Sequence, residues 1–320
     1  MKILLISSGY LGIYPYLEKY IQDSLSNLGN PFITIIPEYN LETIKQIENF
    51  QPDFVLAFVG YKIQQELLQF LKQKGYILGV WLTEDPFYID ESIRLAGNFP
   101  YIFTIDLGAY EYYKQIFPSK KIYHLPLGVE PSIYFPQKTV SQDVYDVCIV
   151  GYPYPERIQL AHHILEQTPY KLLLSGPVWR RYMKIQHHQR LMVINKWMEP
   201  SKVNQLYQLS KIILNPHRAF DFHKNKNTIG IKSKSINNRT FEIAASGGFQ
   251  LLSAKPDIEL HFDPEKEIVS YSTDEECIKL IHAFINDDQE RIHYSEKAME
   301  RVLDCHTFFH RVQKMISLLG

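Results

Sequence analysis

Residues 237–252 read NNRTFEIAASGGFQLL, and the interpretation of the whole chain starts from this stretch. The pattern predicts a short helix with Asn237 as its N-cap, ended by Gly247 in a left-handed conformation and followed by a buried strand. The free N–H groups of a helix start favour an anion, and Arg239 adds positive charge there. Glu242, three residues further on, shares that helix face and can accept both hydrogens of a vicinal diol.

A site for phosphate beside a site for a ribose diol is the chemistry of a nucleotide. The same residues also describe a capped helix with a surface Arg–Glu pair and a glycine turn, and for the motif in isolation this structural interpretation would be favoured. The choice between them depends on what the rest of the chain places beside the motif.

Composition bounds the class of protein. A length of 320 residues accommodates two ordinary domains, and 45% hydrophobic with 22% charged residues is typical of a globular protein. A net charge of −1 gives no electrostatic argument for nucleic acid or for an anionic membrane. The three cysteines are spaced for neither a metal site nor a disulfide framework. Residues 3–6 read as a first buried strand rather than a signal peptide, so we expect a cytoplasmic protein without integral membrane contact.

The first part of the chain alternates continuous apolar runs with helical patterns. Such alternation predicts a parallel sheet covered by helices on both faces. The predicted strands are residues 3–7, 32–36, 54–59, 77–82 and 101–105, and helical spacing occurs in segments such as 16–28 and 63–74.

A polar stretch at 136–143 reads as a linker, after which the alternation restarts. The second part predicts strands at 145–150, 171–175, 211–215 and 267–271, and helices at 157–167, 201–210, 273–286 and 289–305. We therefore predict two Rossmann-like domains with a cleft between them. In such sheets ligands bind outside the carboxyl ends of the strands.

Three predicted strands of the second domain end in residues suited to that site. Gly151 and Arg157 follow the first strand, Gly176 follows the second, and His217 with Arg218 follows the strand before the motif. Each could be an ordinary turn, but their shared placement at strand ends favours a nucleotide site.

Two further segments bear on catalysis. Residues 219–235 are polar and irregular, which is typical of either a solvated loop or a lid whose lysines, Lys234 among them, offset the charge of a diphosphate leaving group. No Asp-x-Asp pair occurs, so the usual carboxylate pair for Mg²⁺ or Mn²⁺ is lacking and we expect no metal cofactor. In the first domain Glu84 or Asp85 could take a proton from an acceptor hydroxyl, and we select Asp85.

The chain resembles the CgeB-type spore-maturation glycosyltransferase-like family, within the GT-B class. The resemblance covers most of the chain and is strongest from residue 145 onward. The residues that carry it include Gly151 with Arg157, Asn215 with His217 and Arg218, Asn238 to Glu242 with Gly247 and Gly248, residues 262–269, and His306 to Phe308 with Arg311.

The resemblance implies an α/β GT-B fold: two Rossmann-like, doubly wound domains facing across a cleft, with a last helix crossing back to the first domain. It implies a nucleotide-sugar donor in the second domain and an acceptor in the first. Carried over, Glu242 would bind the ribose, while Arg239 and the Gly247–Gly248 turn would lie beside the diphosphate. Where related retaining enzymes carry a second Glu, this chain has Lys234.

We therefore predict a metal-independent glycosyltransferase that moves a sugar from a nucleoside diphosphate to the hydroxyl of a glycan, protein or small-molecule acceptor. The predicted domains are 1–138, 139–305 and a C-terminal helix at 306–320. Candidate catalytic residues are Asp85, Lys234 and Arg239. Candidate donor-binding residues are Gly151, Arg157, Gly176, His217, Arg218, Asn238, Arg239, Thr240, Glu242, Gly247 and Gly248. A non-catalytic nucleotide- or glycan-binding descendant in spore or cell-surface assembly remains the alternative, and an epimerase of similar fold is a third.

Overall fold

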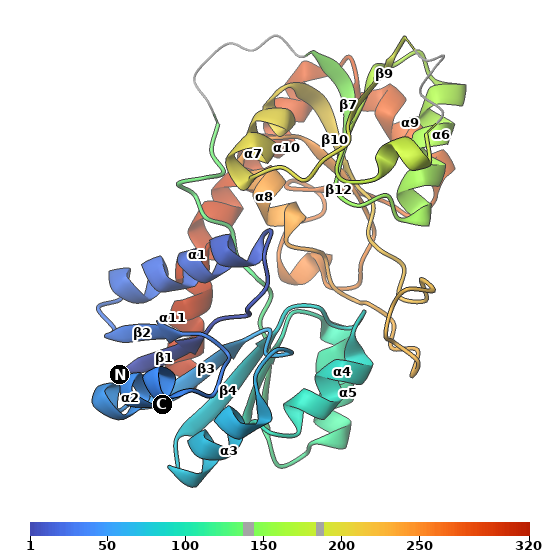
Figure 1. Ribbon diagram of the computed structural model, residues 1–320. Helices are drawn as coiled ribbons and strands as arrows, with labels where there is room; N and C mark the ends of the chain where they lie inside the picture. The colour runs from blue at the N-terminus through green and yellow to red at the C-terminus, as the bar shows by residue number, and fades with distance from the viewer. Residues whose placement is uncertain (137–143, 184–188) are drawn as a thin grey trace. The chain divides into compact units, whose positions relative to one another are not determined.

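The computed structural model describes residues 1–136, 144–183 and 189–320, and its contacts divide the chain into two compact units. Unit 1 comprises Met1–Leu127, Phe220–Ser235 and Phe308–Gly320. Unit 2 comprises Gly128–Ala219 and Ile236–Thr307. Each unit is built on one parallel sheet (Figure 1).

Unit 1 holds a six-stranded sheet in the order β2-β1-β3-β4-β5-β6, with every pair parallel. The strands are β1 Ile3–Ile6, β2 Phe32–Ile35, β3 Phe54–Phe58, β4 Ile77–Leu82, β5 Tyr101–Thr104 and β6 Lys121–His124. The helices are α1 Tyr14–Asn27, α2 Leu41–Phe50, α3 Gln65–Gln73, α4 Ile89–Ala96, α5 Leu107–Ile116 and α11 Phe308–Leu318. The last helix, α11, packs against α1, and Phe308 places its ring 5.3 Å from that of Tyr20.

Unit 2 holds a second parallel sheet, in the order β12-β11-β10-β7-β8-β9. Its strands are β7 Tyr145–Val150, β8 Leu172–Ser175, β9 Leu191–Ile194, β10 Ser210–Asn215, β11 Gln250–Ser253 and β12 Val269–Tyr271. Its α-helices are α6 Pro155–Gln167, α7 Pro200–Gln208, α8 Arg239–Ala245, α9 Asp274–Phe284 and α10 Asp288–Cys305, and short 3-10 turns occur at Trp179–Arg181 and Ile258–Leu260.

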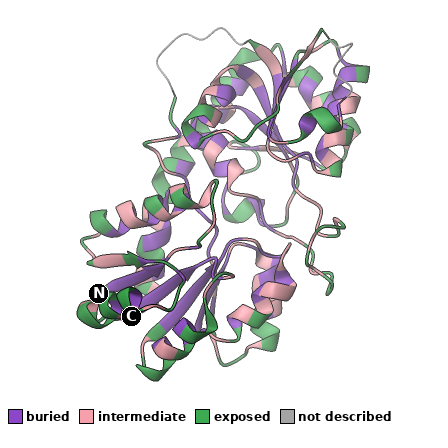
Figure 2. Ribbon diagram, viewed as in Figure 1, coloured by how far each residue is buried: buried purple, intermediate pink, exposed green. Residues whose placement is uncertain are grey.

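The central strands β1, β3, β5 and β8 are buried along their whole length (Figure 2). A parallel strand covered by helices on both faces needs apolar side chains at every position, which is why these strands appear in the sequence as continuous apolar runs. Two of the four edge strands, β6 and β9, are not predicted by the sequence patterns. They show mixed burial and carry polar or exposed side chains such as Lys121 and Met192. An edge strand has fewer covered positions, so its apolar signal is weaker.

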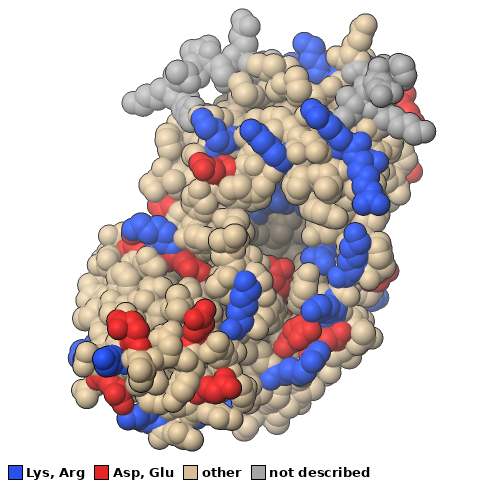
Figure 3. Space-filling view, viewed as in Figure 1, with Lys and Arg blue, Asp and Glu red and all other residues tan. Residues whose placement is uncertain are grey.

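The surface of the described residues mixes charges of both signs. On the face drawn in Figure 3, basic and acidic side chains are interspersed within each unit, in keeping with a net charge of −1. Among the helices of the described residues, none has both the length and the hydropathy that a bilayer span requires.

The segment Phe220–Ser235 belongs to unit 1, although the sequence patterns place it in the second domain. It contains no helix or strand of the kinds described above, and its Ile231 packs against the core of unit 1. The boundary between the units falls at Leu127, eleven residues before the predicted one. The predicted linker at 136–143 lies outside the described residues except for Pro136.

One buried carboxylate fastens this segment to unit 1. Oδ1 of Asp106 accepts the amide hydrogens of Gly108 and Ala109 and so caps α5. Its Oδ2 accepts from Ser233 Oγ at 2.9 Å and from the amides of Lys234 and Ser235 at 3.1 and 3.2 Å. The two oxygens of Asp106 thus hold a helix start and a distant segment together.

We predict that Asp106→Asn releases the segment while it preserves the helix cap. An Asn side chain keeps one acceptor oxygen, which suits the N-cap, but presents an NH₂ group to the amides of Lys234 and Ser235. Loss of these bonds is expected to speed amide hydrogen exchange in 220–235 by about tenfold or more. Asn40→Ala, which removes the cap of α2 in the same unit, is the control. Unchanged protection of 220–235 in Asp106→Asn would contradict the assignment.

Candidate functional site

The strand order of unit 2 locates a site before any side chain is considered. From β7 the chain adds β8 and β9 on one side, whereas β10 lies on the other side of β7 and leads to β11 and β12. The loops after β7 and β10 therefore leave the sheet in opposite directions. In open parallel sheets ligands bind at the carboxyl ends of the strands at such a reversal point.

Gly151, the first residue after β7, lies beneath two guanidinium groups. A Cβ atom at this position would lie 2.4 Å from Nη1 of Arg157 and 2.9 Å from Nη2 of Arg239. The backbone of Gly151 has a φ of +126°, which residues with a side chain rarely adopt. Its carbonyl accepts from Trp179 Nε1 at 2.8 Å, and Gly176 packs so closely on that carbonyl that a Cβ would lie 2.2 Å from it. Both glycines are therefore required by close approach.

Arg157 is buried with its charge. Only 4% of the residue is exposed, and Nε and Nη1 donate to the carbonyl oxygens of Pro216 and Tyr152 at 3.0 Å each. Burial and the neighbouring Arg239 guanidinium lower the pKa of Arg157 to about 9. Two adjoining cations in a poorly solvated place repel each other, and an anion with two negative charges would relieve that repulsion.

An aromatic ring lies between further cations of this cluster. The ring centroid of Tyr154 is 5.3 Å from the guanidinium carbon of Arg157 and 5.0 Å from that of Arg218. Cation–π contact with the ring favours the positive charge of both arginines. Tyr154 lies in the segment Gly151 to Arg157 that follows β7, and the sequence pattern predicts no role for its ring.

Glu242 adjoins the cations from the first turn of α8. Its Oε1 accepts from Asn238 Nδ2 at 2.7 Å, and it also bonds to Tyr134. Burial raises the pKa of the Glu242 carboxyl, while Arg239 and the hydrogen bonds from Asn238 and Tyr134 oppose the rise. A half-buried carboxylate beside a guanidinium is thus held ready to accept hydrogen bonds.

The start of α8 differs from the prediction. Asn238, not Asn237, occupies the N-cap position, with a helical φ of −57°, and its side chain makes no capping bond. Asn237 instead forms a reciprocal amide pair with the fully buried Asn215, with N–O distances of 2.9 and 3.1 Å. Tertiary pairing with the end of β10 therefore takes the side chain that local pattern assigns to the cap.

Other predicted donor residues divide between the cluster and its surroundings. Thr240 is fully buried, and its hydroxyl accepts from Asn215 Nδ2 at 3.0 Å, so it supports α8 from inside. The predicted turn at Gly247 is confirmed by a φ of +71°, and β11 follows as the predicted buried strand. However, Gly247 and Gly248 lie at the opposite end of α8 from Arg239, so the structure does not bring them to the cation cluster.

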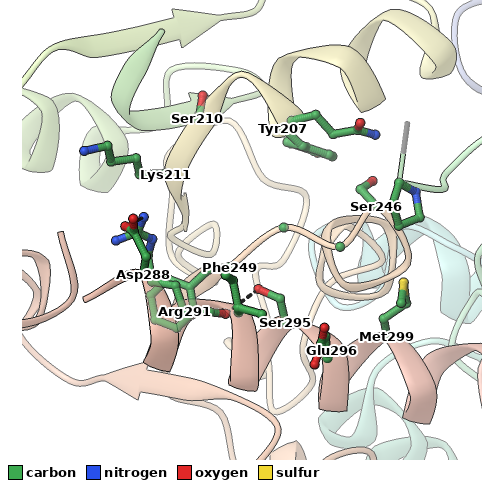
Figure 4. Close-up of a pocket in the computed structure, with 15 residues that line it drawn as sticks. Tyr207, Ser210, Lys211, Ser246, Phe249, Asp288, Arg291, Ser295, Glu296 and Met299 are labelled. Atoms are coloured by element: carbon green, nitrogen blue, oxygen red, sulfur yellow. Dashed lines mark hydrogen bonds and ion pairs between the residues drawn. The ribbon is translucent and has the colours of Figure 1, made fainter. Parts of the chain in front are cut away.

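Both glycines line a separate pocket of about 540 Å³ in unit 2 (Figure 4). Figure 4 shows that its walls come from the end of α7, the start of β10, the turn after α8 and one side of α10. A Cβ at Gly248 would lie 2.8 Å from Ile213 Cδ1, so packing against β10 explains this glycine without a phosphate.

Two predicted catalytic residues belong to unit 1. Lys234 is anchored there by the contact of its amide with Asp106, and its Nζ forms an ion pair with Glu111. Asp85 is 1% exposed, and its Oδ2 accepts from Thr104 Oγ1 at 2.7 Å and from Tyr113 OH at 3.0 Å. A base must reach its substrate, so the burial of Asp85 argues against its predicted role as the base.

The reversal point of unit 1 lies between β1 and β3, and tyrosines gather at the strand ends there. The rings of Tyr10 and Tyr14 are 5.3 Å apart, and those of Tyr61 and Tyr88 are 6.4 Å apart. Glu84, which follows β4, accepts a hydrogen bond from Tyr14. Unlike Asp85, Glu84 is only partly buried. Aromatic faces beside a carboxylate are the groups with which proteins bind saccharides and take up a hydroxyl proton.

Two parallel six-stranded units, with cations gathered at a strand-order reversal, define the GT-B fold class of glycosyltransferases. The structure is similar over its full length to sucrose-phosphate synthase from Thermosynechococcus elongatus (TM-score 0.71, 10% identity, 98% of that chain). It is also similar to Anabaena HepE in complex with UDP and glucose (TM-score 0.66, 13% identity, 100% of this chain and 99% of that one). The predicted fold class is confirmed.

A family model described as glycosyl transferase-like matches residues 156–317. Spore protein CgeB of Bacillus subtilis (strain 168) is 33% identical over 293 residues, which are 91% of this chain and 90% of that protein. The chain belongs to this glycosyl transferase-like family, as the sequence resemblance predicts.

Burial of Asp85 predicts a measurable pH dependence of stability. Burial raises the pKa of Asp85 from 3.8 to about 6, against hydrogen bonds from Ser92, Thr104 and Tyr113. A folded-state pKa above the unfolded value means that stability present at low pH is lost as the pH rises toward 6. Asp85→Asn lacks this titration and does not lose this stability. The free energy of unfolding of the variant, relative to that of the wild type, is therefore expected to rise by about 2 kcal/mol between about pH 4.5 and 7.5.

Urea denaturation at both pH values measures this difference. Asp23→Asn, which makes the same substitution at a solvent-accessible carboxylate on α1, is the control. A constant difference between Asp85→Asn and the wild type would show that the Asp85 carboxyl is solvated.

Proposed function

We propose that the chain transfers a sugar from a nucleoside diphosphate to an acceptor hydroxyl, with the donor held by unit 2. The observation that supports the proposal most directly is the convergence of Arg157 and Arg239 on Gly151. Their positive charges would be compensated by the diphosphate, and the Glu242 carboxylate would accept from the ribose hydroxyls. Arg218 would extend the positive region past Tyr154.

The proposed reaction breaks the bond between the anomeric carbon of the sugar and the diphosphate oxygen, whose electron pair stays with the leaving diphosphate. The acceptor oxygen forms the new bond to that carbon, and its proton passes to a base. Arginines that are already oriented stabilise the leaving group without reorganisation during the reaction. We propose that these cations, rather than a divalent metal, meet the developing charge.

For the base we propose Glu84 in place of Asp85. Glu84 is partly exposed among Tyr10, Tyr14 and Tyr88, whereas Asp85 is enclosed by hydroxyl groups. The tyrosine rings would pack on the apolar face of a saccharide or similar acceptor. The name of the Bacillus subtilis relative, Spore protein CgeB, supports a search for that acceptor among spore components. HepE, whose structures contain UDP with glucose and UDP-glucose, supports UDP-sugars as the first donors to test.

Donor binding is predicted to depend on Arg239 and Glu242. Arg239→Gln should weaken UDP binding by about ten- to a hundredfold, because a charge-assisted contact to phosphate contributes roughly 1.5–3 kcal/mol. Glu242→Gln should weaken UDP and uridine binding by a similar factor, since the carboxylate would contact the ribose that both ligands share. Isothermal titration calorimetry measures both effects, with Arg180→Gln on the surface of unit 2 as the control.

Binding of UDP to Arg239→Gln with wild-type affinity would contradict the diphosphate assignment. If the wild type binds none of UDP, GDP, dTDP and CDP at millimolar concentration, the donor proposal fails as a whole.

Turnover is predicted to depend on Glu84. Glu84→Gln should lower the rate of UDP-sugar consumption by about a hundredfold or more, within the range of general-base effects, while UDP affinity stays unchanged. Asp85→Asn should retain most of the activity, and added EDTA should have no effect. An equal loss of rate in Glu84→Gln and Asp85→Asn would contradict the assignment of Glu84 as the base. UDP binding without turnover in the wild type would favour the non-catalytic alternative.

A further inference from the structure

His217 makes three hydrogen bonds that fix which of its ring nitrogens carries a proton. Nε2 lies 3.0 Å from the backbone nitrogen of Asn237, whose N–H can only donate. Nε2 is therefore an unprotonated acceptor, and in the neutral ring the hydrogen is on Nδ1. That hydrogen is donated to Ser253 Oγ at 2.6 Å, and the same oxygen accepts the backbone amide of His217 at 2.9 Å.

The surroundings keep this ring neutral. His217 is 8% exposed. Burial, followed by the charges of Lys255, Arg157 and Arg239, holds the pKa of His217 well below its usual 6.5. These cations come from the segment after β11, from α6 and from α8, so every named charge facing the ring opposes a proton on Nε2. An imidazole whose two nitrogens are already bonded has no nitrogen left for a substrate.

The three bonds join the ends of neighbouring strands to the entry of α8. His217 follows β10, Ser253 ends β11, and Asn237 lies two residues before the first residue of α8. The Asn237 side chain is separately paired with Asn215 at the end of β10. The backbone and the side chain of Asn237 are thus fixed independently, two residues before Arg239.

We propose that His217 is a positioning residue that fixes the backbone at Asn237 and thereby sets the placement of Arg239 and Glu242. The sequence predicts that His217 contacts the donor. Because both ring nitrogens are bonded to Ser253 and Asn237, the proposed role acts through the backbone instead. What Arg239 and Glu242 bind rests on the proposed function, whereas the hydrogen-bonded arrangement of His217 does not.

Two amide substitutions separate the two ring nitrogens. In His217→Gln the side-chain amide reaches the place of Nε2 and can still accept from Asn237, whereas in His217→Asn it reaches only the place of Nδ1. We expect amide exchange in residues 236–241, measured without any nucleotide, to be about tenfold faster in His217→Asn and close to wild type in His217→Gln. His293→Gln, at an exposed position on α10, is the matched control. Equal exchange in both variants of His217 would overturn the proposal.

Function provides the second measurement. UDP affinity should fall by about five- to tenfold in His217→Asn and stay within about twofold of wild type in His217→Gln, in parallel with exchange. The dependence of the rate of UDP-sugar consumption on pH should have the same shape in His217→Gln as in the wild type. If the rise or the fall of the rate with pH disappeared in this variant, the ring would be a proton carrier and the positioning role would be overturned. If the wild type binds no nucleotide, the proposed function fails, and the exchange experiment still decides whether His217 holds Asn237.

Discussion

The candidate site of unit 2 depends on one electrostatic constraint. Two guanidinium groups lie against the same glycine, Gly151, and repel each other. Arg157 and Arg239 come from helices far apart in sequence and converge above Gly151, where a side chain would displace both. Burial excludes the water that would otherwise screen their charges. The pKa of Arg157 is lowered because burial and the nearby Arg239 both disfavour its charged form. An arrangement of this kind persists because the surrounding fold holds it, and it favours a ligand that brings negative charge.

The groups that hold the cations in place are almost all neutral. Asn215 pairs with Asn237, Tyr154 lies against two arginines, and His217 is kept uncharged. A supporting carboxylate at these positions would neutralise the cations before a ligand could. Glu242 is the exception; it lies at the first turn of α8, where a ligand with both phosphate and diol groups could contact it and Arg239 together. Neutral supporting groups therefore leave the charges of Arg157 and Arg239 uncompensated by the residues that hold them in place.

In unit 1, by contrast, the charged groups are bonded within the protein. Both carboxylate oxygens of Asp106 accept hydrogen bonds from amides and a hydroxyl, and Lys234 forms an ion pair with Glu111. These contacts draw the segment Phe220–Ser235 onto unit 1, although it is connected in sequence to the strands of unit 2. A basic segment that reads as a possible lid in the sequence is thus docked on unit 1, where Lys226 pairs with Glu91 and Lys234 with Glu111.

The sequence by itself determined the class of fold, because a strand covered on both faces must be apolar where it is covered. Strands β1 and β3 are apolar throughout, as are residues 147–150 of β7 and 172–174 of β8. It also determined the turn at Gly247 and the strand-end placement of Gly151 and Arg157, since these follow from local geometry and chain order. Only the tertiary structure decided which side chains are available: Asp85 and Lys234 read as reactive in the sequence, yet one is enclosed and the other paired. The burial of Asp85 and the ion pair of Lys234 depend on residues that are distant along the chain, and a local sequence pattern contains no information about such contacts.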